Sequence, residues 1–164
     1  PYTYVPGRCA HPVTDPAGHL YGTVRGEAPP LDPQRWEEST TYLRGIDLFN
    51  FGYYWEAHEE WEGLWHAAGR AGPTATWLKG LIKLAAAGVK VYEGRRAGVS
   101  RHAARARELF DAVQRAASDG ELAGLRLEAL LALAAALESS PPEPQEAPPC
   151  PGLLGCLEPR RKDR

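Results

Sequence analysis

The sequence predicts an all-α protein, a single-domain antiparallel bundle of about five helices. Apolar residues recur at helical spacing through its middle, and of the fifteen prolines only Pro73 lies between Gln34 and Ser140. The connections between the periodic stretches are short, which places consecutive helices antiparallel. The predicted parts are an irregular Pro/Gly-rich N-terminal arm (residues 1–31), an all-helical core domain (residues 32–138) and a flexible, disordered Pro-rich C-terminal tail (residues 139–164).

Each predicted helix is bounded by residues that start or stop helices. Asp32 followed by Pro33 is typical of an N-cap and a first helical position. Gly52 allows the chain to turn into the second helix, and glycine pairs separate the second, third and fourth helices. The predicted helices cover residues 33–50, 53–68, 74–92, 99–117 and 125–138.

The composition sets limits on compartment and partners. A chain of 164 residues, 43% of them hydrophobic and 24% charged, fits one globular domain with tails. A net charge of −2 gives no general electrostatic reason to bind nucleic acid or an anionic membrane. The three cysteines are unlike a secreted disulfide scaffold, and the apolar runs are too short and too charged to cross a bilayer. We therefore expect a cytoplasmic protein that binds neither nucleic acid nor membrane.

The segment from Trp55 to Trp65 carries the strongest functional signal. At about 100° and 1.5 Å per residue, His58 and Glu62 lie one above the other on one helical face. That face is apolar, and an ionised carboxylate is unfavourable there without a partner. Four aromatic residues continue the same face, Phe51, Tyr54, Trp55 and Trp65. The pattern predicts that something converges on the His58/Glu62 pair.

The remaining glutamates of this segment fall on the opposite side of the predicted helix. They are Glu56, Glu59 and Glu60, and we expect solvent to surround them.

Three stretches together resemble the prokaryotic domain-of-unknown-function family 309. They are residues 49–59 (FNFGYYWEAHE), the HxxxExxW pattern from His58 to Trp65, and residues 80–87 (GLIKLAAA), within a resemblance that covers roughly residues 42–113. Members are small all-helical proteins described as predicted metal-dependent hydrolases. The resemblance implies that His58 and Glu62 are metal ligands or acid/base groups and that Trp65 packs beside them.

One departure from the family pattern concerns charge on the third predicted helix. Glutamines often stand in the family where this chain has Lys79 and Lys83, and a histidine stands near Lys90. These lysines share one helical face, at about 0°, 40° and 20° around the axis. If that face meets His58 and Glu62, cations occupy positions where a metal site favours neutral or anionic donors.

A divalent ion needs three or four donors, of which one helix supplies two here. We expect the metal ligands to be His58, Glu62 and His102, with His66 as an alternative third ligand and Zn, Fe, Mn or Ni as the ion. Glu59 or Glu62 would act as the base toward a water molecule. The second and fourth helices would enclose this pocket, with Tyr54, Trp55, Trp65 and Lys83 lining it.

Two functions remain open. The first is a metal-dependent hydrolase of an unidentified small substrate, with His58, Glu62 and Glu59 as catalytic residues. The alternative is a non-catalytic, helical-hairpin (repeat-like) module that binds a small molecule or a peptide, in which His58 and Glu62 form a structural network with Lys83 or Tyr54. In the arm, His11 and His19 either close over the pocket as donors or belong to a segment that covers apolar surface.

Overall fold

The all-α prediction is confirmed by a computed structural model, which describes residues 2–24, 26–116, 120–146 and 148–160. In these residues the chain forms five α-helices, a single 3-10 turn η1 (Trp36–Glu38) and a two-stranded hairpin. None of the described helices has the length and apolar character needed to cross a membrane. The helices are α1 (Thr40–Asn50), α2 (Tyr54–Ala67), α3 (Gly72–Tyr92), α4 (Arg96–Ala116) and α5 (Leu127–Ser139).

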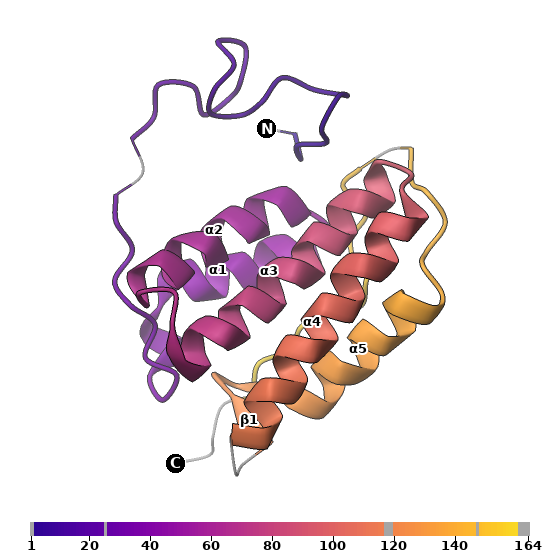
Figure 1. Cartoon of the computed structure of the whole chain (residues 1–164). Helices are drawn as coiled ribbons and strands as arrows, with labels where there is room; N and C mark the ends of the chain where they lie inside the picture. Colours follow the sequence, from indigo (N-terminus) through magenta and orange to yellow (C-terminus); the bar gives the residue numbers. More distant parts are fainter. Residues whose placement is uncertain (1, 25, 117–119, 147, 161–164) are drawn as a thin grey trace.

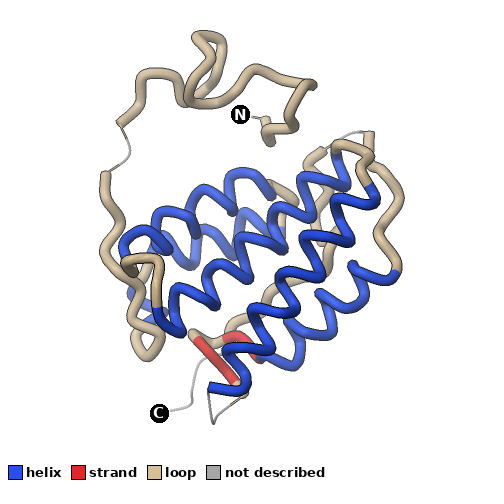
Figure 2. The backbone as a smooth tube through the Cα atoms, viewed as in Figure 1, coloured by secondary structure: helices blue, strands red, loops and turns tan. Residues whose placement is uncertain are grey.

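Each helix packs against the next one in the chain, so that α2, α3 and α4 lie side by side with α3 in the middle (Figures 1 and 2). Most residues of α3 are therefore buried. α3 lies between α2 and α4 and packs against both, whereas the prediction has the second and fourth helices enclosing the pocket directly.

Glycines allow the central helices to approach closely. A Cβ atom added to Gly88 of α3 would lie 2.3 Å from Cγ of Tyr54 at the start of α2. A Cβ atom added to Gly80 of α3 would lie 2.4 Å from Cε1 of Phe110 in α4. Since heavy atoms in contact are normally about 3.5–4 Å apart, any larger residue at these positions would push the helices apart.

The first helix begins at Thr40, seven residues later than the sequence predicts. The Oδ1 atom of Asp32 accepts a hydrogen bond from the backbone N–H of Gln34 at 2.9 Å, which makes a turn there instead of a helix start. Ser39 is the actual N-cap, because its side chain accepts a bond from the backbone N–H of Tyr42.

The hairpin was not predicted. It pairs β1 (Glu121–Leu122) with β2 (Leu125–Arg126) just before α5. Ala123 and Gly124 form its turn with positive φ angles of 46° and 78°, and the carbonyl of Ala123 accepts a hydrogen bond from the buried Tyr42 hydroxyl. Residue 117, where the fourth predicted helix ends, lies outside the described residues.

The N-terminal arm is irregular but is fixed to α2 by a buried carboxylate. Glu56 is only 8% exposed, and it accepts hydrogen bonds from the Thr3 hydroxyl at 2.9 Å and from the Tyr4 backbone N–H at 3.0 Å. The expectation that solvent surrounds Glu56 is therefore wrong. Helical periodicity places this side chain on the side of the helix away from the core, but the arm packs over that side and buries it.

The C-terminal segment also has defined contacts. Residues 150–157, here called the C-terminal strap, have no regular secondary structure, yet Leu154 and Leu157 are buried. Asn50 donates to the carbonyl of Leu157 and accepts from its backbone N–H, and the hydroxyl of Tyr54 accepts from the backbone N–H of Leu154. Within the described residues, the prolines prevent helices in this region without preventing it from packing on the core.

Candidate functional site

Three side chains of α2 place possible metal-ligand atoms close to one another. The Nδ1 atom of His58 lies 3.5 Å from a carboxylate oxygen of Glu59 and 3.9 Å from a carboxylate oxygen of Glu62. One donor atom from each of the three lies within 4.8 Å of the other two. His58 and Glu62 come together because four residues span just over one helical turn, as the sequence predicts.

The imidazole nitrogen between these carboxylates has no hydrogen-bond partner in the described structure, although the atom itself is buried. A buried nitrogen without a partner is unfavourable, and a bound cation would satisfy it. Ligand atoms held about 2.1 Å from a tetrahedral ion are roughly 3.4 Å from one another. This separation is close to both distances from Nδ1 to the carboxylate oxygens. The residues present therefore fit a divalent metal ion, with two carboxylates to balance its charge.

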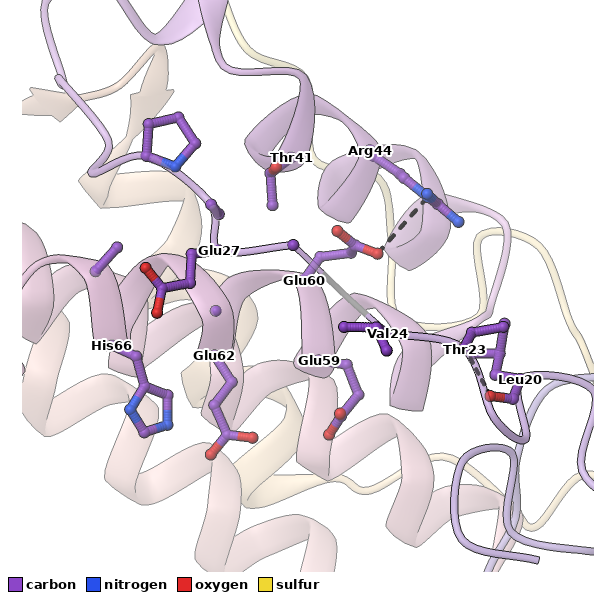
Figure 3. Close-up of a pocket in the computed structure, with 15 residues that line it drawn as sticks. Leu20, Thr23, Val24, Glu27, Thr41, Arg44, Glu59, Glu60, Glu62 and His66 are labelled. Carbon is purple, nitrogen blue, oxygen red and sulfur yellow. Dashed lines mark hydrogen bonds and ion pairs between the residues drawn. The ribbon is translucent and has the colours of Figure 1, made fainter. Parts of the chain in front are cut away.

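Glu59, predicted as a catalytic base but on the solvent side of the helix, joins this group. Its side chain is 27% exposed, as is that of His58, so solvent does not surround it. Figure 3 shows Glu59 and Glu62 pointing the same way from α2, whereas Glu60 points away toward Arg44, with which it forms an ion pair at 3.7 Å. The sequence signal for this arrangement is a glutamate directly after the histidine, combined with one four residues later.

His102, the expected third ligand, is not in the converging group of described residues. It lies on α4, half-buried, within electrostatic range of His58. Burial lowers the pKa of His102 first, and the charges of Lys83, Lys90 and Arg101, and then His58, lower it further. His66, the alternative ligand, instead accepts a bond from Arg70 at the exposed end of α2.

We expect the pKa of His102 to rise when Lys83 is replaced by glutamine, because the protonated imidazole no longer faces that cation. The pH titration of the His102 ring protons by NMR measures the change. Lys79→Gln is the control, since Lys79 is not among the charges that lower this pKa, and an equal shift in both variants would contradict the assignment.

The same lowered pKa makes the stability of the wild type depend on pH. His102 binds a proton more readily in the unfolded chain than in the folded one, so this residue destabilises the fold as pH falls below about 6.5.

The expected ligand-pocket residues lie in different surroundings. Tyr54 is fully buried in the core, which raises the pKa of its hydroxyl, and this hydroxyl accepts a hydrogen bond from the backbone N–H of Leu154. Trp55 packs edge-on against Tyr4 and His11 of the arm. Trp65 lies under the Lys79 ammonium group, 5.2 Å from the ring centroid.

The arm histidines do not join the converging group of described ligands. The Nδ1 atom of His11 accepts bonds from the backbone of Val13 and Thr14, and His19 packs edge-on against Tyr2. The described arm therefore uses both rings in its own structure and in its packing on α2.

A groove of about 820 Å³ lies between the arm and α1 and α2. Residues 20, 23, 24 and 26–29 of the arm form one wall, and Glu59, Glu60 and Glu62 lie on the other (Figure 3). His58 does not line this groove, so two of the three converging residues face both the groove and the imidazole.

Comparison with known families agrees with the sequence resemblance. Residues 42–102 match the family described as Domain of unknown function (DUF309), a segment that runs from α1 to His102 and contains all three converging residues. No curated protein matches the chain.

Proposed function

We propose that this protein is a metal-dependent hydrolase of a small substrate and that His58, Glu59 and Glu62 hold its ion. One observation carries the proposal, the buried His58 nitrogen that lies between two carboxylates without a hydrogen-bond partner. One imidazole and two carboxylates suit Zn, Mn or Fe, and three protein ligands leave coordination positions open for water and substrate.

In hydrolysis a water oxygen bonds to the electrophilic centre, the bond to the leaving group breaks, and one proton moves from the water to that group. A divalent ion at this site would supply Lewis-acid chemistry and lower the pKa of the attacking water. Glu59 and Glu62 are both close enough to the His58 nitrogen to share the roles of ligand and proton acceptor. Their partial burial strengthens the attraction of both carboxylates for a cation.

Metal content tests the proposal directly. We expect elemental analysis of the purified chain to show one divalent ion, and His58→Gln and Glu62→Gln to weaken Zn²⁺ or Mn²⁺ binding by at least about a hundredfold in calorimetry. Glu60→Gln is the matched control on the same helix, because Glu60 points away toward Arg44. Metal-dependent hydrolysis of p-nitrophenyl phosphate or p-nitrophenyl acetate should be lost in the same two variants. A folded wild type that binds neither ion would overturn the proposal.

The groove beside the arm favours a second candidate function, a non-catalytic module that binds a small molecule or a peptide. Its volume of about 820 Å³ suits such a ligand, and His58 is not part of its lining. In that case His58→Gln and Glu62→Gln would lower the melting temperature without any change in metal content. The same calorimetry and a thermal scan therefore separate the two functions.

A further inference from the structure

The arm gives the groove of about 820 Å³ a largely apolar wall. Leu20, Val24, Ala28 and Pro29 line the groove from this side. Val24 is 95% exposed, so almost its whole side chain is available to a molecule in the groove. Apolar surface that lines a concave site is the part of a pocket that covers the hydrocarbon portion of a ligand.

Carboxylates line the same groove from both sides. Glu59, Glu60 and Glu62 belong to α2, and Glu27 belongs to the arm (Figure 3). The side chains of Glu59 and Glu62 are 27% and 39% exposed. Because partial burial reduces screening by water, these carboxylates attract a cation more strongly than fully exposed ones do.

The cations of the lining do not balance these negative charges. Among the described residues that line the groove, Arg44 is the only arginine or lysine, and it pairs with Glu60 at 3.7 Å. His66 accepts a hydrogen bond at 2.9 Å from Arg70, which lies outside the lining and stacks over Trp65. The described lining therefore carries an excess of negative charge, which favours a cationic ligand.

Glu27 is the carboxylate that a ligand would meet without displacing another contact. It is exposed, and it forms no hydrogen bond or ion pair with any other residue that the structure describes. Glu59 and Glu62 lie beside His58 as the proposed metal ligands, and Glu27 is not part of that group. A metal ion and a cationic ligand would therefore use different carboxylates.

We propose that the groove binds a small amphipathic amine, whose ammonium group pairs with Glu27 and the α2 carboxylates and whose apolar body covers Val24. A neutral apolar molecule would take water from the carboxylates without replacing its hydrogen bonds, and a carboxylate ligand would meet like charge. For the proposed hydrolase such an amine is the substrate class, and this part rests on the proposed function. Binding of the amine itself needs no metal.

Three six-carbon ligands with different charges test the proposal. Hexylamine, 1-hexanol and hexanoate are titrated into the full-length protein, freed of metal with a chelator, and followed by calorimetry and NMR. We expect hexylamine to bind at least about tenfold more tightly than 1-hexanol, the effect of two or more partly exposed ion pairs. Hexanoate should not bind, because its charge has the same sign as the groove.

Variants at exposed positions test the two walls separately. Glu27→Lys should weaken hexylamine binding about tenfold, because it replaces an attraction with a repulsion. Glu158→Lys is the matched control, since Glu158 is also exposed in an irregular segment but does not line the groove. Val24→Ser should weaken binding about threefold through lost apolar contact. Val13→Ser, in the same arm but outside the lining, should change it less than about twofold.

Equal affinity for hexylamine and 1-hexanol would overturn the proposal, and so would equal effects of Glu27→Lys and Glu158→Lys. Circular dichroism of each variant identifies any loss of fold, and the Val24→Ser and Val13→Ser pair leaves every charge in place. The metal titration keeps the two proposals apart. A chain that binds Zn²⁺ but not hexylamine overturns only the amine site, and one that binds hexylamine but no metal overturns only the hydrolase.

Discussion

Replacing Gly88 with alanine is expected to lower the free energy of unfolding by about 2 kcal/mol, because the new methyl group overlaps a ring that has no room to move. The added Cβ atom would lie 2.3 Å from Cγ of Tyr54, which is fully buried. The rings of Phe49 and Tyr92 pack against Tyr54 at centroid distances of 5.2 and 5.4 Å. Urea denaturation followed by circular dichroism measures the loss.

Gly63→Ala is the matched control for that experiment. Gly63 also lies inside a helix, α2, and a Cβ atom there would meet nothing within 4 Å. The higher helix propensity of alanine should then raise the free energy of unfolding by about 1 kcal/mol. If both substitutions changed stability in the same direction, close packing of α3 on α2 would not be the reason for glycine at position 88.

The helices could be predicted because their signals are local. Apolar spacing and glycine punctuation lie within each segment, so α2, α3 and α5 begin and end within about two residues of their predicted bounds. The first helix was predicted to start too early because Asp32 with Pro33 and Ser39 are both acceptable N-caps. Only the folded chain shows that Asp32 makes a turn and that Ser39 begins the helix.

The candidate site could be predicted only in part. Helical geometry alone brings His58 and Glu62 together. The position of Glu59 depends on how its side chain bends toward the imidazole, and the burial of Glu56 depends on residues more than 50 positions earlier in the chain. The place of His102 depends on the register of α4 against α3, which glycine contacts set and periodicity does not show.

The packing of the C-terminal strap has no sequence signal beyond three leucines beside a proline and two glycines. Prolines exclude helices and sheets, but they do not exclude an irregular segment that places apolar side chains on a core and pairs its backbone with buried polar groups. Tyr54 and Asn50 provide such groups. Both residues flank the turn into α2, so the strap supports the start of the helix that carries His58 and Glu62.

Leu154→Ala is therefore expected to destabilise the fold by about 3 kcal/mol and to lower the melting temperature by roughly 6–12 °C. Leu154 is 2% exposed and belongs to the main apolar core, and shortening it leaves a cavity that the helices close only in part. Leu153→Ala, one residue earlier, is the control, because that side chain is only partly buried and its loss should cost about 1 kcal/mol. Thermal denaturation followed by circular dichroism compares the two variants. Equal and negligible effects would mean that the strap is a mobile tail that does not support the start of α2.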